Sequence, residues 1–246
     1  MRFSANLGFL WADLPLPEAI RAAARAGFRA VECHWPYATP PAAVAGALAE
    51  TGLRLLSLNT RPGAAGEFGL TALPGREAEA RAAIDQALDY AAAIAAPMVH
   101  VMAGKGGDEA TFLRGLAHAC DRAPPGVTLL IEAINPHDVP GYFLNDLDQA
   151  ARIVQRLDRP NLRLMVDCYH VARSGGDPRA LFARHRALVG HVQIAGVPDR
   201  GPPDRGTLDY PALLAAMDWP HPIGAEYRPP GPTEASLGWL TSPGFA

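Results

Sequence analysis

Residues 127–167 read VTLLIEAINPHDVPGYFLNDLDQAARIVQRLDRPNLRLMVD. The stretch begins and ends with short apolar runs that are typical of buried strands, VTLLIEA at 127–133 and NLRLMVD at 161–167. Between them, DLDQAARIVQRLD at 146–158 has a helical pattern and opens with Asp146, a good N-cap. A strand, a helix and a second strand in succession predict two parallel strands joined by a helical crossover.

The same alternation of strand and helix continues along the rest of the chain. Further strand-like runs lie at residues 2–6, 29–34, 53–59, 97–104, 191–196 and 222–227. Further helical patterns lie at residues 16–27, 40–52, 76–95, 108–123, 177–189 and 208–218. Gly27 and Gly52 stop two of these helices, and Asp108 and Asp177 open two others. No stretch resembles a linker between domains.

Eight strands alternating with helices in 246 residues match the count and size of a (β/α)₈ TIM barrel. We therefore expect an α/β fold, a single-domain barrel over residues 1–246. A doubly wound open sheet is the alternative, but such sheets often carry a Gly-rich phosphate loop after the first strand, and NLGFLW at 6–11 is not one. The long segment 60–75 is expected to be a loop on the active face.

Composition excludes several classes of protein. With 49% hydrophobic residues, 19% charged residues and a net charge of −3, a sizeable core is expected and disorder is not. No basic stripe pairs with aromatic residues, which argues against nucleic-acid binding. No signal-peptide pattern is present, and the most apolar stretch, 90–104, is interrupted by Pro97 and His100, so we expect no membrane span. The three cysteines form no C-x-x-C pair, and we expect a cytoplasmic protein.

Side chains alternate between the two faces of a strand, and the two faces of the predicted strands differ in kind. One face is apolar or small on every strand, and we expect it to meet the helices. The other face carries polar residues near the C-terminal end of each strand: Ser4, Asn6, Glu32, Ser57, Asn59, His100, Glu132, Asp167, His191, Gln193 and Glu226. Because the C-terminal ends of barrel strands form the active face, these side chains are expected to share one mouth.

Three carboxylates of this set indicate the chemistry. Glu132, Asp167 and Glu226 cannot all be free anions in a closed site, because repulsion and desolvation would raise the pKa of at least one of them. A divalent cation relieves that repulsion, and carboxylate oxygens with the Gln193 carbonyl suit Mg²⁺ or Mn²⁺. Glu132 and Glu226, across the site from each other, could also move a proton between neighbouring carbons of a hydroxy-carbonyl compound. This is isomerase or epimerase chemistry.

Other polar residues near this site have two interpretations each. Arg200, after the seventh strand, is either a clamp for a substrate carboxylate or a surface arginine. His170 is either a ligand or substrate contact or a histidine satisfied within its loop. His100 and His191 are interpreted as residues that orient the carboxylates, and Asp167 could instead cap the next turn. An aromatic group either rims the site or packs the loops: Trp11, His34, Trp35 and Phe68.

Four motifs, IEAINPHDVPGYFLND, NLRLMVDCYH, GHVQIAGVPDR and GAEYRP, resemble in order and spacing the hydroxypyruvate isomerase family, which belongs to the xylose-isomerase-like barrels. The resemblance covers the chain from Phe3 to Pro230. It implies a divalent metal held by Glu132, Asp167, Gln193 and Glu226, with Glu132 and Glu226 as the acid/base pair. Substrate contacts are expected from His170, Arg200, His191, His100, Asn59 and Glu67.

The resemblance also implies a reaction, the interconversion of hydroxypyruvate and tartronate semialdehyde (2-hydroxy-3-oxopropanoate) through an enediolate, and a homo-oligomer. Three loops depart from the family pattern: Gly201-Pro202-Pro203 after PDR, Gly206-Thr207-Leu208 before Asp209-Tyr210, and TRPGAAGE after Asn59. Because these loops depart from the pattern, the resemblance does not identify the substrate. A 2-oxo-tetronate isomerase or a ketose 3-epimerase would use the same site, and a metal-dependent endonuclease or a non-catalytic sugar-binding barrel is a more distant alternative.

Overall fold

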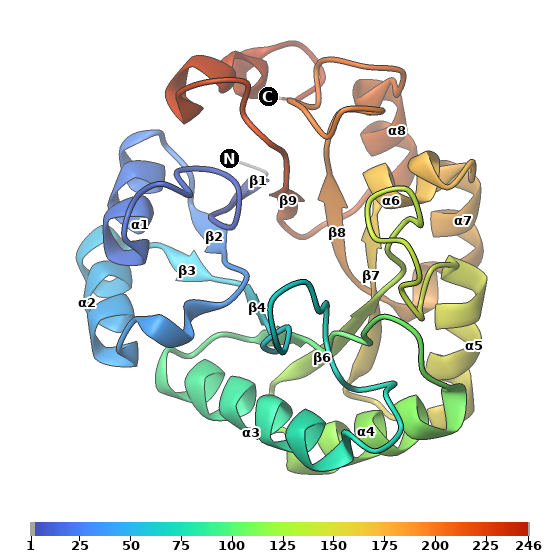
Figure 1. Ribbon diagram of the computed structural model, residues 1–246. Coiled ribbons are helices and arrows are strands. Elements are labelled where there is room, and N and C mark those ends of the chain that lie inside the picture. Colours follow the sequence, from blue (N-terminus) through green and yellow to red (C-terminus); the bar gives the residue numbers. More distant parts are fainter. Residues whose placement is uncertain (1–2, 246) are drawn as a thin grey trace.

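The computed structural model describes residues 3–245, and nine strands in this range form one parallel sheet (Figure 1). The strands are β1 (Phe3–Asn6), β2 (Ala30–Glu32), β3 (Arg54–Leu55), β4 (Ser57–Asn59), β5 (Met98–His100), β6 (Thr128–Glu132), β7 (Leu162–Asp167), β8 (Val189–Ile194) and β9 (Ile223–Ala225). Hydrogen-bonded neighbours follow the order β3-β2-β1-β9-β8-β7-β6-β5-β4. Arg2, which the predicted first strand includes, lies outside the described residues.

The sheet closes into a barrel at its two end strands, β3 and β4, which are consecutive in the chain. β3 and β4 are the two parts of the predicted strand 53–59, separated at Leu56. Leu56 donates its N–H to Val31 O (2.8 Å) and accepts from Met98 N–H (3.1 Å), so that it joins β2 on one side to β5 on the other. The predicted α/β barrel is therefore confirmed, and the open-sheet alternative is wrong.

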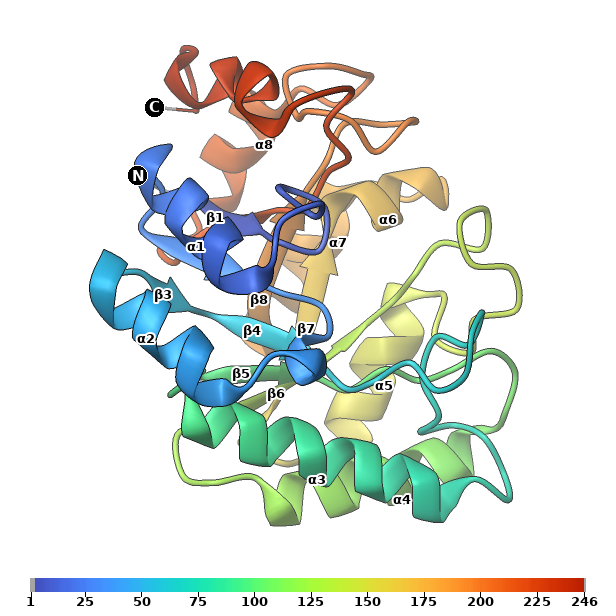
Figure 2. The ribbon, with the colours of Figure 1, turned by 60° about the vertical axis from the view of Figure 1, so that its left-hand side comes forward.

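Helices pack around the outside of this barrel (Figures 1 and 2). They are α1 (Leu16–Arg25), α2 (Pro41–Thr51), α3 (Glu77–Ala93), α4 (Glu109–Arg122), α5 (Leu147–Leu157), α6 (Cys168–Arg173), α7 (Pro178–His185) and α8 (Tyr210–Met217), with short 3₁₀ turns η1 (Pro36–Ala38), η2 (Arg186–Leu188), η3 (Thr233–Ser236) and η4 (Gly238–Thr241). Each predicted helix is present, and α6 is an addition that follows β7 without a loop. Within residues 3–245, no helix combines the length and the apolar character needed to span a membrane.

Aspartate caps begin several of these helices. The three predicted caps accept backbone N–H groups of the first turn: Asp108, Asp146 and Asp177. Asp167 caps α6 in the same way, since its Oδ1 accepts from Tyr169 N–H at 2.9 Å. The interpretation of Asp167 as a cap is thus confirmed, and it does not exclude a role for the second oxygen, Oδ2, in the site.

The two faces of the strands are buried against different partners. Apolar outward residues such as Val31, Leu58 and Val99 belong to the main hydrophobic core. The inward polar side chains are buried as well, although they carry charges or amides: Ser4, Asn6, Glu32, Ser57, His100, Glu132, Asp167, His191, Gln193 and Glu226. Burial of so many polar groups requires partners for them in the barrel interior.

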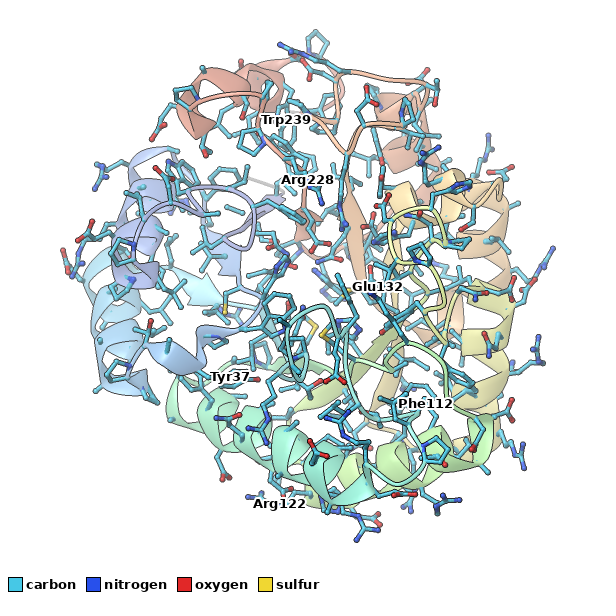
Figure 3. The ribbon with its side chains drawn as sticks, in the orientation of Figure 1. Tyr37, Phe112, Arg122, Glu132, Arg228 and Trp239 are labelled. Carbon is cyan, nitrogen blue, oxygen red and sulfur yellow. The ribbon has the colours of Figure 1, made fainter. Side chains whose placement is uncertain are left out.

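Trp239 in η4 packs the C-terminal segment against the first strand, β1. We expect its removal to destabilise the fold. The ring is fully buried, lies edge-on to Phe3 (ring centroids 4.8 Å apart) and to Phe245 (5.2 Å), and donates from Nε1 to Tyr227 OH (3.3 Å) (Figure 3). Trp239→Ala should lower the free energy of unfolding by about 3–5 kcal/mol, because it leaves a large cavity. Urea denaturation measures this loss.

Trp35→Ala is the matched control for Trp239→Ala. Trp35 is 41% exposed and donates one hydrogen bond, to Thr60 O (3.1 Å), so its replacement should cost about 1 kcal/mol or less. Equal losses for the two tryptophans would contradict the packing role assigned to Trp239.

Candidate active site

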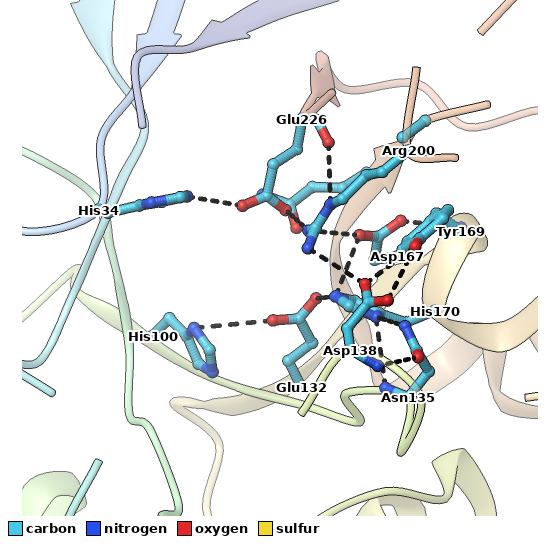
Figure 4. A network of polar contacts seen from close by, with 12 residues as sticks. His34, His100, Glu132, Asn135, Asp138, Asp167, Tyr169, His170, Arg200 and Glu226 are labelled. Carbon is cyan, nitrogen blue, oxygen red and sulfur yellow. Dashed lines mark hydrogen bonds and ion pairs between the residues drawn. The ribbon is translucent and has the colours of Figure 1, made fainter. Parts of the chain in front are cut away.

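Three carboxylates converge at the C-terminal ends of their strands (Figure 4). Glu132 ends β6, Asp167 ends β7 and Glu226 directly follows β9. Each is at least 93% buried. The sheet order places β7 and β8 between Glu132 and Glu226, so these two glutamates approach the site from different sides of the barrel.

Arg200 lies among these carboxylates. It comes from the loop after β8, where its backbone has a positive φ of 55°, and its side chain is only 11% exposed. Its Nη2 lies 3.1 Å from Glu226 Oε2 and 3.4 Å from Asp167 Oδ2. The guanidinium also faces the rings of Phe9 and Tyr169, at 4.8 and 5.1 Å from their centroids. The surface interpretation of Arg200 is therefore wrong, and its first partners are the site's own carboxylates.

His34 holds the other oxygen of Glu226. Its Nε2 lies 2.7 Å from Glu226 Oε1, close enough to donate a hydrogen bond to the carboxylate. Gly8 makes room for the ring, since a Cβ there would lie 2.2 Å from His34 Nδ1. Sequence reasoning treated His34 only as an aromatic rim or packing residue. The signal that could have found it is the alternation after Glu32, which gives residue 34 the same inward face.

His170 presents one ring nitrogen to the carboxylates. Its Nδ1 accepts from the backbone N–H of Asn135 (3.3 Å) and faces the side-chain amide of the same residue (2.6 Å). Nδ1 therefore carries no proton in the neutral ring, and Nε2 does. Nε2 lies 3.7 Å from Asp167 Oδ2 and 3.9 Å from Glu132 Oε1. Although these three residues lie close enough together to suggest a metal cluster, a protonated Nε2 is a hydrogen-bond donor and not a ligand.

The charges of the three carboxylates are not balanced by Arg200. Burial raises the pKa of Glu132 well above its usual value, and Glu226 and Asp167 raise it further. Burial likewise raises the pKa of Asp167, to about 7, against the effect of Arg200. Burial would raise the pKa of Glu226 too, but Arg200 and His34 outweigh it and hold this pKa at about 2. A negative charge on Glu132 would therefore lack a compensating cation within the described residues, and the protonated form of Glu132 is favoured.

Gln193, at the end of β8, lies beside this cluster. It is in register with Asp167 on β7, and its Nε2 donates to Glu32 Oε2 (2.8 Å). Its Oε1 is buried and has no hydrogen-bond partner among the described residues, and the same is true of Glu132 Oε1. Two unpartnered buried oxygens, one of them on a carboxyl whose ionised form lacks a compensating charge, are what a bound cation would satisfy.

A cavity of about 290 Å³ opens above the cluster. Apolar side chains line part of its wall: Phe9, Trp35, Phe68, Met102, Ile134 and Val139. Of the predicted site residues, Glu132, Glu226, His100, Asn59, His170 and Arg200 line it, and Arg228 joins them. Asp167, Gln193 and His191 do not line it and lie behind those residues. The predicted single mouth is thus a cavity with a second group of polar side chains behind it.

Glu67 has partners outside the cavity. Its carboxylate accepts from Arg76 Nη1 (2.9 Å) and from the backbone N–H of Ala64 (2.7 Å), and it does not line the cavity. The next residue, Phe68, does line it. The structure therefore gives Glu67 a position within its loop and no contact with the other candidate residues.

The loop 196–207, which departs from the family pattern, closes on itself and presents Arg200. Gly196 N–H donates to Gly201 O (2.7 Å), and Thr207 N–H donates to Val197 O (2.9 Å). Gly206 passes so close that a Cβ there would lie 2.2 Å from Val197 O. These contacts fix the backbone on both sides of Arg200.

The chain matches the family model described as "Xylose isomerase-like TIM barrel" over residues 20–242. A protein of Cupriavidus necator named 2-oxo-tetronate isomerase is 44% identical over 97% of both chains. A Homo sapiens protein named "Putative hydroxypyruvate isomerase" is 42% identical over 98% of this chain and 95% of its own. Among solved structures, one of an "AP endonuclease, family 2" from Brucella melitensis is 39% identical, with a TM-score of 0.92 over 97% of both chains.

Proposed function

The chain belongs to the xylose isomerase-like TIM barrel family and is an isomerase, and we propose that it interconverts the keto and aldehyde forms of a small hydroxy-keto acid. Hydroxypyruvate and tartronate semialdehyde are the proposed pair, and a 2-oxo-tetronate is the second candidate because the Cupriavidus necator relative carries that name. The observation that carries the proposal is the pair of buried glutamates, Glu132 and Glu226, at the floor of a cavity of about 290 Å³.

A divalent cation, Mg²⁺ or Mn²⁺, belongs to this proposal. Its ligands would be Glu132, Asp167, Gln193 and Glu226, which supply oxygen atoms of the kind that these hard cations prefer. The unpartnered oxygens of Glu132 and Gln193, and the lack of a compensating charge for ionised Glu132, support this assignment. Such a cation polarises a substrate carbonyl and so makes the neighbouring C–H more acidic.

The two glutamates would carry the proton between carbons. One removes a proton from C3 of hydroxypyruvate, which gives an enediolate, and the other delivers a proton to C2. The C3 hydroxyl loses its proton and becomes the aldehyde, while the C2 oxygen gains one and becomes a hydroxyl. His170 lines the cavity, and we propose that its Nε2–H donates to one of these oxygens.

Arg228 is the residue that we assign to the substrate carboxylate. Arg200 is already engaged by Glu226 and Asp167. Arg228, two residues after Glu226, also lines the cavity and lies over the ring of Phe9, with its Cζ 5.5 Å from the centroid (Figure 3). Within residues 3–245 its guanidinium makes no ion pair with an acidic side chain. A free guanidinium at the cavity wall suits bidentate contact with a carboxylate.

Replacing Arg228 should therefore separate keto acids from uncharged sugars. Arg228→Met is expected to raise KM for hydroxypyruvate about 10- to 100-fold, the loss expected for a charge-assisted hydrogen bond, and to change KM for a ketose by less than about 3-fold. Arg156→Met, which removes an exposed arginine paired with Glu109 outside the barrel, is the control. Steady-state kinetics with both substrates measure the difference, and an equal effect on the two substrates would contradict the assignment.

A substrate panel tests the function itself. The wild-type enzyme with Mg²⁺ or Mn²⁺ is assayed with hydroxypyruvate, tartronate semialdehyde, 2-oxo-tetronates and free ketoses, and with DNA that carries an abasic site. Turnover of the keto acids, with solvent deuterium entering the carbon next to the carbonyl, is the expected result. Turnover confined to ketoses, or cleavage of the DNA alone, would overturn the keto-acid proposal.

A further inference from the structure

Glu32 forms a hydrogen-bonded group behind the cavity. It ends β2, is fully buried and does not line the cavity. Its Oε1 accepts a hydrogen bond from Ser4 Oγ. Its Oε2 accepts from Gln193 Nε2 (2.8 Å) and from Ser57 Oγ (3.4 Å), and His191 Nε2 lies 3.1 Å from the same oxygen. Four polar side chains thus surround one carboxylate that has no access to substrate.

The contact with Glu32 decides which way the Gln193 amide faces. A carboxylate only accepts hydrogen bonds, so the end of the amide that faces Glu32 must be the NH₂ group. The carbonyl oxygen, Oε1, then lies at the opposite end of the amide, where it is buried without a partner among the described residues. Turned around, the same amide would present N–H groups to a cation, and N–H groups cannot act as ligands.

Gly224 supplies the space for this contact. It is in register with Gln193 on the neighbouring strand β9. A Cβ at this position would lie 2.6 Å from Glu32 Oε1 and 2.7 Å from Gln193 Cγ. Any other residue at position 224 would displace Glu32 or Gln193. The glycine at this position in β9 therefore supports the same arrangement, independently of the hydrogen bonds.

We infer that Glu32 is a positioning residue for the divalent metal, because it holds Gln193 with its carbonyl oxygen toward the cation. The inference rests on the metal site of the proposed function. It adds Glu32 to that site as a residue that supports a ligand without being one. Partners that orient a metal ligand from behind are worth about 10- to 100-fold in metal affinity in other proteins. Glu32 acts through Gln193 and touches neither the cation nor the substrate.

Metal affinity of the full-length apoprotein tests this role, with Mn²⁺ as the probe. Isothermal titration calorimetry compares the wild type with Glu32→Gln, which keeps the size of the side chain and allows the amide of Gln193 to face either way. We expect Kd for Mn²⁺ to rise about 10- to 100-fold. Thermal unfolding without metal is measured in parallel, because a merely structural role would lower Tm and leave Kd unchanged.

A double-mutant cycle shows whether the effect passes through Gln193. In a Gln193→Ala background, Glu32→Gln should change Kd for Mn²⁺ by less than about 2-fold, because the ligand that it orients is gone. An unchanged Kd in the folded single variant, or the same loss in both backgrounds, would overturn the positioning role alone. Absence of Mn²⁺ binding by the wild type would overturn the metal site of the proposed function and this inference with it.

Discussion

Glu226→Gln is expected to lower kcat for the keto acid by about 10³- to 10⁴-fold while the protein stays folded. A glutamine cannot take up or release the proton, and loss of a general acid or base typically costs about 10²- to 10⁴-fold. The amide still fits the space and can contact His34, which lies 2.7 Å from Glu226 Oε1. Arg200 keeps its contact with Asp167 at 3.4 Å. Kinetics at saturating Mn²⁺, with metal content measured for each sample, separate a lost proton carrier from a lost metal ligand.

Glu50→Gln is the matched control for Glu226→Gln. Glu50 is exposed and paired with Arg21 on the outside of the barrel, so the same chemical change there should leave kcat within about 2-fold of the wild type. If metal-loaded, folded Glu226→Gln kept a tenth or more of the wild-type kcat, Glu226 would not be one of the two proton carriers.

The strands, and with them the carboxylates, could be predicted because they follow a local rule. Alternation of side chains along a strand needs only neighbouring residues, and it correctly indicated that Glu132 and Asp167 point into the barrel. The same rule does not show whether an inward-facing side chain lines the cavity or lies behind it. Glu32 and Glu132 share the inward face, yet Glu32 lies behind the cavity with Ser4 and Glu132 lines it. Depth depends on the tilt and stagger of the whole barrel, which no single strand encodes.

Residues on loops could not be placed from the sequence, because their positions depend on long-range contacts. Arg200 lies in a loop whose conformation is set by Gly196, Gly206 and their partners, and no periodicity indicates that its guanidinium reaches Asp167. Arg228 looked like part of a motif and carried no predicted role. Only the cavity that the closed barrel creates shows that Arg228 lines its wall, where it has no acidic partner among residues 3–245.

Arg200 also explains how the site can remain assembled without a cation. Three buried carboxylates with no positive charge among them would repel one another. Arg200 draws Asp167 and Glu226 together, at 3.4 and 3.1 Å from its Nη2, and leaves Glu132 as the carboxylate without compensation. The proposed cation next to Glu132 would therefore meet carboxylates that are already close together, which would lower the cost of ordering them on binding.

Removal of the metal should accordingly abolish turnover without unfolding the protein. After exhaustive dialysis against a chelator, activity is expected to fall to background and to return on addition of Mn²⁺ or Mg²⁺, because the substrate carbonyl is no longer polarised. The apoprotein should keep a cooperative thermal transition, since Arg200 still compensates Glu226 and Asp167. Adding Mn²⁺ at 100 times its Kd should then raise the free energy of unfolding by about 2.7 kcal/mol, because the cation binds only the folded state.

Two measurements on the same dialysed sample test whether turnover depends on the metal. Elemental analysis establishes that the metal is gone, and the keto-acid assay follows at once. Full turnover by a sample with less than about 0.01 metal ions per chain would contradict the metal's role, because metal-dependent activity falls in proportion to occupancy. Lost turnover that no divalent cation restores, in a sample that still unfolds cooperatively, would contradict it as well. The proposed ligand residues Glu132, Asp167 and Gln193 are buried in the folded chain and should still be in place. Restoration by Mn²⁺ together with the rise in stability is the outcome expected if the proposed cation binds these oxygens.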